Sequence, residues 1–174
     1  MKKAFVLAVL AVLVTACGGT EQAHNDQDVS FAKEMVQHHQ QALEMSRLVP
    51  DRSSSAPVLD LAARIEKAQD PEIKEMEGWL GAWGAAPADE HGGGHGDMAG
   101  MMTGAEMTQL AQASGTEFDR LWLELMIKHH RGAVDMAKKQ LAEGADPGAK
   151  ALAQRIIDAQ QSEIGEMEQL LNQG

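Results

Sequence analysis

The sequence predicts an all-α protein, an antiparallel four-helix bundle formed by tandem duplication of a helical hairpin. The pattern M-x-x-H-H-x-x-A-x-x-M occurs at residues 35–45 and returns 91 residues later, at 126–136. The same offset relates a second segment in each half, from Leu61 and Leu152 onward. In every segment the apolar residues recur at the spacing of one helix face, and no strand pattern competes. Two such hairpins can bury these faces only against each other.

The first hairpin is predicted over residues 28–83. Its first helix is expected to start near Asn25, an N-cap residue with Asp28 three positions later. Its second helix has Pro57 in its first turn, where proline is favoured. Pro71 removes an amide donor inside this helix, so we expect a kinked helix; a break before Pro71 is the alternative.

Residues 84–104 are rich in Gly and poor in branched apolar residues, which predicts a mobile linker. A short helix should follow, because Thr103 and Glu106 have the spacing of a capping box. The second hairpin is predicted over 116–172, with its first helix starting near Thr116.

The N-terminal segment predicts export and a lipid anchor. Residues 1–17 contain Lys2 and Lys3, a short apolar run, and small residues directly before the only cysteine, Cys17. This order resembles a bacterial lipoprotein signal, in which the cysteine is lipidated; a plain secretory signal is the alternative. Residues 18–27 would then form a flexible tether. Lipid alone would hold the protein at a membrane, on the periplasmic or extracellular face of the cell envelope.

The charge of the chain argues against some partners. The 15 basic residues fall to 13 without Lys2 and Lys3, against 26 acidic residues, so the net charge is about −13 with His neutral. This negative field disfavours nucleic acid and anionic lipid surfaces as partners. No motif identifies a protein partner.

The paired histidines are candidate metal ligands. Each pair lies one helical turn after a Met, and two adjacent imidazoles inside a bundle need polar partners, which a metal ion can provide. A core of gap-filling Met and hydrogen-bonded His is the alternative. Met35 is one turn from the His pair, whereas Met45 lies about 10.5 Å along the axis from His38 and must join another group, such as Met76. The second repeat has the same spacing, with Met136 set apart.

The ligand types favour a soft ion. Thioether and imidazole, without thiolate or an inward carboxylate cluster, suit monovalent copper or silver better than Mg, Ca or Mn; zinc on imidazoles alone is an alternative. A ferritin-type di-iron site would need Glu-x-x-His, but Met stands three residues before His38 and before His129. The Gly-rich segment shares these ligand types and adds five further candidate ligands, with an incidental spacer as the alternative: His91, His95, Met98, Met101 and Met102.

No sequence feature predicts catalysis. Nucleophile–base motifs, phosphate-binding loops and HExxH are absent from the sequence. Glu72 and Glu75 recur as Glu163 and Glu166, but repeated acidic residues on a helix are expected to face solvent. The sequence therefore predicts that the protein is not an enzyme.

Four segments carry a family resemblance: FAKEMVQHHQQALEM with ARIEKAQDPEIKEMEGWL, and FDRLWLELMIKHHRGAVDM with AQRIIDAQQSEIGEMEQLL. Together they resemble the two halves of the bacterial family called domain of unknown function 305, over roughly residues 28–172. The resemblance implies export, a ferritin-like four-helix fold and, as in some members, periplasmic copper binding linked to copper resistance. By position it marks as candidate metal ligands Met35, His38, His39, Met45, Met76, Met126, His129, His130, Met136 and Met167.

The predicted function is therefore an exported, membrane-anchored copper-binding protein that buffers, sequesters or hands over copper through Met and His sites. The alternative is a structural or protein-interaction module of the cell envelope that binds no metal.

Overall fold

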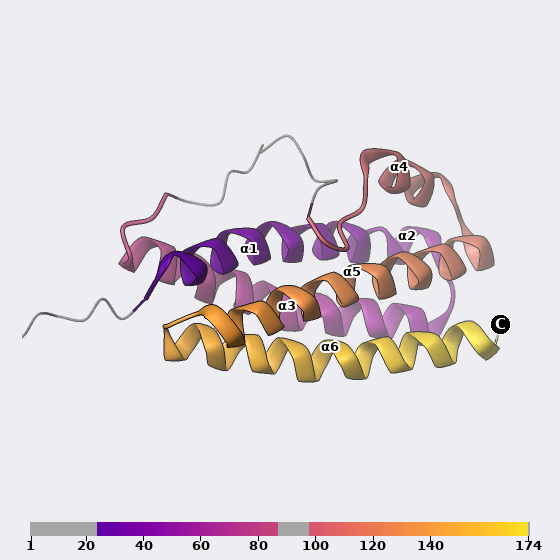
Figure 1. Cartoon of the computed structure of the whole chain (residues 1–174). Helices are drawn as coiled ribbons and strands as arrows, with labels where there is room; N and C mark the ends of the chain where they lie inside the picture. Colours follow the sequence, from indigo (N-terminus) through magenta and orange to yellow (C-terminus); the bar gives the residue numbers. More distant parts are fainter. Residues whose placement is uncertain (1–23, 87–97, 174) are drawn as a thin grey trace, which may run out of the picture.

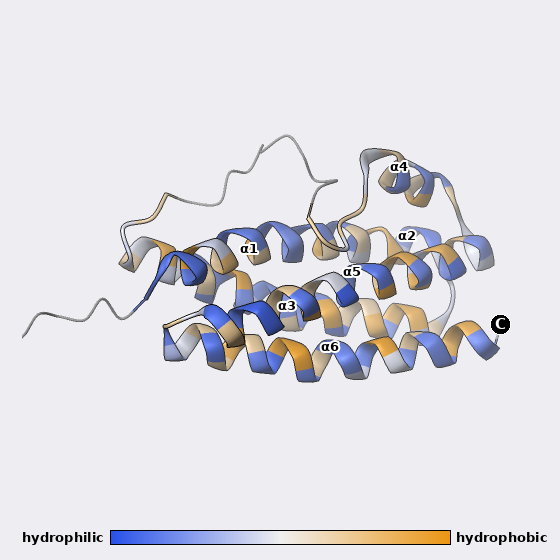
Figure 2. Ribbon diagram, viewed as in Figure 1, coloured by the Kyte–Doolittle hydropathy of each residue, from blue (hydrophilic) through white to orange (hydrophobic). Residues whose placement is uncertain are grey.

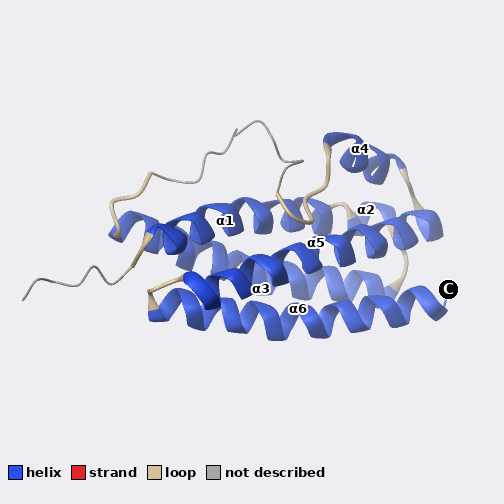
Figure 3. Ribbon diagram, viewed as in Figure 1, coloured by secondary structure: helices blue, strands red, loops and turns tan. Residues whose placement is uncertain are grey.

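The computed structural model describes residues 24–86 and 98–173. The predicted signal with Cys17, and His91 and His95, lie outside the described residues. Within them the chain is helical, with connecting turns and no strand (Figure 3). Of the six helices in the described residues, α2 and α4 are short and the other four are long (labelled in Figure 1). Their bounds are α1 (Asp26–Arg47), α2 (Val49–Arg52), α3 (Ala56–Ala82), α4 (Gly104–Gln112), α5 (Gly115–Glu143) and α6 (Pro147–Gln173).

The four long helices form the predicted bundle. Helices α1 and α3 pack as one hairpin, α5 and α6 as the other, and α1 joins the two by packing against α5 in the opposite direction (Figure 1). Two exposed ion pairs bridge α3 and α6: Arg64 with Glu166, and Arg155 with Glu75. The two pairs are equivalent, because Arg64 corresponds to Arg155 and Glu75 corresponds to Glu166 at the repeat offset. This equivalence indicates a pseudo-twofold relation between the hairpins.

Local sequence signals explain the helix boundaries. Asn25 and Asp28 form a reciprocal capping box at the start of α1, so the helix begins inside the segment predicted as tether. Thr103 and Glu106 form the predicted box at the start of α4. Helix α3 runs through Pro71 without a break, as favoured from the sequence, and α5 begins one residue before Thr116. In the part of the chain that is described, no helix is long and apolar enough to cross a membrane.

The core consists of two apolar clusters at different levels of the bundle. One contains Met45 of α1 and Met126 of α5; the other contains Met35 of α1 and Ala133 of α5. The His pairs lie between these positions along both helices. Figure 2 shows the polar and apolar stretches that alternate along each long helix. The fold therefore places a polar layer between two methionine-containing apolar clusters.

The predicted mobility of the linker is wrong for its last residues. Met101 and Met102 are buried, with 3% and 0% of their surface exposed, and Met102 belongs to the same cluster as Met126. Two large apolar side chains pack here although the surrounding sequence is rich in Gly, because the glycines let the backbone approach the bundle closely.

Candidate metal centre

Four imidazoles form the polar layer. His38 and His39 of α1 and His129 and His130 of α5 are all fully buried. The rings of His38 and His129 lie 3.7 Å apart between centroids, inclined by 42°. This contact arises because the two antiparallel helices cross where their equivalent residues face each other.

Two carboxylates hold the outer imidazoles. His39 Nε2 lies 2.8 Å from Glu72 Oε2, and His130 Nε2 lies 2.7 Å from Glu163 Oε2. The prediction that these two glutamates face solvent is wrong: their side chains are only 19% and 13% exposed. Glu75 and the equivalent Glu166 do lie at the surface, paired with arginines.

The hydrogen bonds fix where the ring protons lie. A carboxylate or a carbonyl oxygen only accepts, so Nε2 donates in His39, in His130 and in His38, whose partner is the carbonyl of Ala99 at 3.1 Å. When such a ring is neutral, its Nδ1 has a free lone pair. The Nδ1 atoms of all three rings are buried without a hydrogen-bond partner, as are both ring nitrogens of His129.

The two central rings are neutral near pH 7. Burial, with a smaller contribution from the neighbouring imidazole of His39, lowers the pKa of His38 to about 3. Burial also holds the pKa of His129 well below its usual value, reinforced by the other three imidazoles. Neutral imidazole is the form that binds metal ions.

The methionines gather in two groups related by the repeat. Met35 and Met76 share one apolar cluster, against which the half-buried Met136 packs. The equivalent residues Met126, Met167 and Met45 share the other cluster, together with Met102. Met45 therefore does not lie with Met76, as suggested from spacing along one helix, because the antiparallel crossing brings it to the partner repeat. Met98 is half-buried and belongs to neither cluster.

The described residues provide few imidazole and carboxylate donors at any one point of the layer. Among the residues described, no three His, Cys, Asp or Glu side chains are grouped so that they could hold one ion. Thioether sulfur is the other donor type that flanks this layer, in the two methionine-containing clusters, and it suits a soft monovalent ion better than a hard divalent one.

Sequence reasoning missed Glu72, Glu163 and the carbonyl of Ala99. A signal for the glutamates existed: each lies 33 residues after its histidine in both repeats. A metal-binding His usually donates its other ring N–H to a carboxylate or a carbonyl oxygen, and a search for such a partner could have found the two glutamates. No sequence signal identified Ala99.

The comparisons with known proteins place this geometry in a family. The family described as Domain of unknown function (DUF305) matches residues 28–171. The chain belongs to this family. This DUF305 chain is 36% identical to a DUF305 protein from Streptomyces coelicolor, covering 84% of this chain and 93% of that one, with a TM-score of 0.77. A DUF305 fragment from Deinococcus radiodurans gives 36% identity, 86% and 98% coverage and a TM-score of 0.79.

A third DUF305 neighbour has been solved with metal. CopM in its Cu(I)-bound form is 31% identical, covers 84% of this chain and 96% of its own, and has a TM-score of 0.72. CopM has also been solved in Cu(II)-bound and Ag-bound forms. A comparison with curated proteins finds no match.

Proposed function

We propose that this protein is an exported, lipid-anchored copper-binding protein that buffers, sequesters or hands over monovalent copper, and that it binds rather than catalyses. The observation that carries the proposal is the set of buried Nδ1 atoms of His38, His39 and His130. Each ring is held through Nε2 by an oxygen acceptor, and each Nδ1 lacks a hydrogen-bond partner. A buried lone pair without a partner is costly unless something binds it.

The neighbouring methionines indicate which ion would bind. Each His pair lies one turn from a fully buried methionine, Met35 or Met126, and the cross-repeat clusters add further sulfur atoms. The histidines of one repeat would hold the ion together with thioethers of the apolar cluster that contains the methionine one turn away, Met35 or Met126. Copper and silver in the solved forms of CopM support this choice for a family member. Silver is the expected second ion, and zinc is the weaker candidate because thioether is a poor zinc ligand.

The location proposal rests on residues 1–17 and Cys17, which lie outside the described part of the chain. Replacement of Cys17 by Ala should release the protein from membranes or block its processing. Equal membrane retention of the variant would contradict the lipid anchor.

The test of metal binding is a competition titration against a chromogenic chelator of monovalent copper, under reducing conditions. The informative variant replaces Met35, Met76, Met126 and Met167 with Leu, which nearly conserves volume and leaves every histidine hydrogen bond in place. We expect it to stay helical and to bind copper more than about 100-fold more weakly, because it loses ligands themselves rather than their supports. Met107→Leu is the matched control, since Met107 is half-buried on α4.

Three results would change the proposal. Unaltered affinity in the folded Met→Leu variant would exclude thioether ligation. Absence of copper binding in the wild type would leave the structural module as the better description. If His91→Ala with His95→Ala removed the tightest site, the bundle would be a scaffold for a metal-capturing linker.

A further inference from the structure

The segment 98–103, which we call the strap, lies across the seam between α1 and α5 and occurs only once in a duplicated chain. The carbonyl of Ala99 accepts the hydrogen bond from His38 Nε2, so the strap contacts the imidazole layer directly. The other two hydrogen-bonded imidazoles face helices instead: His39 binds Glu72 of α3, and His130 binds Glu163 of α6. The strap is therefore the only non-helical element among these three partners.

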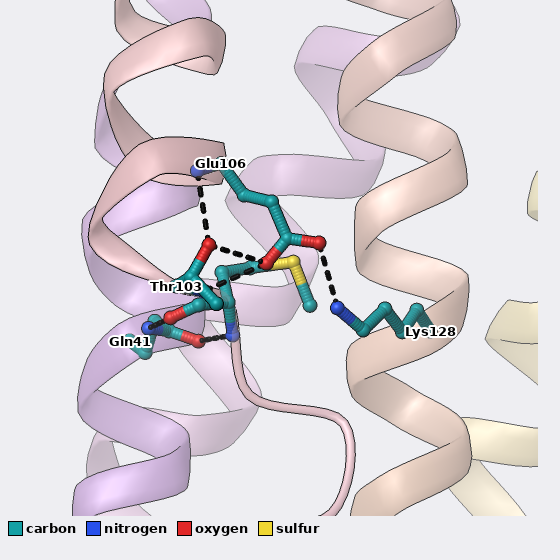
Figure 4. A network of polar contacts seen from close by, with 5 residues as sticks. Gln41, Thr103, Glu106 and Lys128 are labelled. Carbon is teal, nitrogen blue, oxygen red and sulfur yellow. Dashed lines mark hydrogen bonds and ion pairs between the residues drawn. The ribbon is translucent and has the colours of Figure 1, made fainter. Parts of the chain in front are cut away.

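The first repeat holds the strap with an amide side chain. Gln41 of α1 is 6% exposed and forms two hydrogen bonds to the backbone of Met102 (Figure 4). Its Nε2 donates to the Met102 carbonyl at 2.9 Å, and its Oε1 accepts from the Met102 amide at 2.7 Å. One side chain thus satisfies both polar groups of a buried backbone residue.

In the second repeat the equivalent position has no side chain, and the strap packs directly against the backbone of α5 there. Gly132 is the counterpart of Gln41 at the repeat offset. A Cβ atom at Gly132 would lie 2.0 Å from the carbonyl oxygen of Ala99, well inside contact distance. At Gly100, where φ is +80°, a Cβ atom would lie 2.8 Å from the carbonyl oxygen of Lys128. The two copies therefore differ at this repeat position, and the residue in each copy fits the strap.

A third attachment lies at the end of the strap. Glu106 accepts hydrogen bonds from Thr103 in the capping box and from Lys128 Nζ of α5 at 2.7 Å (Figure 4). This pair is at the surface and contributes little to stability. The strap is thus fixed by backbone hydrogen bonds and close packing, without secondary structure of its own.

We propose that the strap is a displaceable cover over the imidazole pair of His38 and His129, held by Gln41 and Gly132, and that its release limits how fast a soft metal ion enters and leaves. This inference rests on the proposed function, because it concerns access to the same site. Opening the strap frees the seam above His38 while the four long helices stay packed. Entry from another side requires α3 or α6 to separate from the bundle, a larger unfolding event than release of a short segment.

The test compares metal loading in variants that loosen the strap from opposite sides. Gln41→Leu removes both hydrogen bonds to Met102, and Gly132→Ala places a methyl group against Ala99. Gly78→Ala is the matched control, since no atom lies within 4 Å of a Cβ there. None of these residues is a proposed ligand. Circular dichroism verifies that each variant keeps its helices.

Stopped-flow mixing with Ag(I), followed by removal with a chelator, measures both rates. We expect loading and release to be about tenfold faster, or more, in Gln41→Leu and Gly132→Ala, because two hydrogen bonds or one packed contact are lost. The control should load at the wild-type rate. Wild-type rates in both loosened variants would overturn the inference.

A measurement without metal separates this inference from the proposed function. Amide hydrogen exchange of Met102, and carbethoxylation of His38 by diethylpyrocarbonate, should both be faster in the two loosened variants than in Gly78→Ala. If the wild type binds no Ag(I) or Cu(I), the proposed function fails, and these two rates still report whether the cover exists. Equal exchange and modification in all variants would show that Gln41 and Gly132 do not hold the strap over the site.

Discussion

Asp28 in the first repeat is fully buried and accepts hydrogen bonds from four donors, whereas its counterpart Asp119 in the second repeat has a buried Oδ1 without a partner. The Asp28 donors are the backbone amides of Asn25, Ala145 and Asp146 and the side chain of Gln140. One carboxylate therefore caps α1 and ties the loop between α5 and α6 to it. Asp119 makes no corresponding bond to the first repeat.

The imidazole layer shows the opposite behaviour. His39 with Glu72 and His130 with Glu163 have the same geometry in both repeats, to within 0.1 Å. Two differences between the repeats lie beside this layer and at one end of the bundle: positions 41 and 132, which contact the strap, and Asp28, which binds the loop between α5 and α6. The duplication has kept the two outer His–Glu pairs symmetric, whereas His38 and His129 differ because only His38 binds the strap.

The largest expected effect is at Asp28. Asp28→Ala leaves buried backbone amides without an acceptor, which should lower the free energy of unfolding by about 3 kcal/mol or more. Asp119→Ala should change it by less than about 1 kcal/mol, because no hydrogen bond of its Oδ1 is lost. Urea unfolding of both variants measures the difference. Equal costs would show that the carboxylates are equivalent despite their different partners.

This difference should depend on pH. Burial raises the pKa of Asp28, but the hydrogen bonds from Asn25, Ala145, Gln140 and Asp146 together lower it below its usual value. The stabilisation is therefore fully present above the unfolded-state pKa of about 4 and is lost as the pH falls through the lower folded-state pKa. The gap in unfolding free energy between wild type and Asp28→Ala should narrow from pH 6 to pH 3. A constant gap would contradict the assigned charge state.

The next largest expected effect concerns the equivalence of the two His–Glu pairs. Glu72→Gln and Glu163→Gln keep an oxygen acceptor beside the histidine but remove its charge, which should weaken copper binding about 10- to 100-fold each. Because the two pairs are equivalent, the two losses should agree within a factor of about 3. The same chelator competition measures both. Glu75→Gln is the control, because Glu75 is paired with Arg155 at the surface and not with a histidine.

The parts of the fold that the sequence predicts are the repeated and periodic ones. Four long helices, the capping boxes at Asn25 and Thr103 and the inward His and Met follow from local spacing, which the structure preserves. The repeat also implies that the two halves face each other. Spacing along one helix, however, does not reveal which Met of the other repeat lies opposite, and the predicted grouping of Met45 with Met76 is therefore wrong.

The remaining parts depend on contacts distant in the chain. Glu72 and Glu163 occupy half-buried positions at the edge of a helix face, where composition alone suggests solvent, and only their histidine partners make them part of the layer. The strap looks like a flexible spacer in the sequence, but its one glycine, Gly100, packs against Gly132, which lies some 30 residues later. A local pattern contains no information about such a contact.

The smallest expected effect concerns the ion pairs that bridge α3 and α6. Arg64 binds Glu166 and also Asp60, whereas its counterpart Arg155 binds Glu75 and has Ala151 at the position of Asp60. Double-mutant cycles on the two bridging pairs should each give less than about 1 kcal/mol, since all four side chains are substantially exposed. The Arg155 pair should be the stronger by a few tenths of a kcal/mol, because Asp60 retains part of the attraction of Arg64 when Glu166 is removed. Asp60→Ala should make the two cycles equal, and a difference that persists in that variant would place its origin in the packing of α3 against α6 instead.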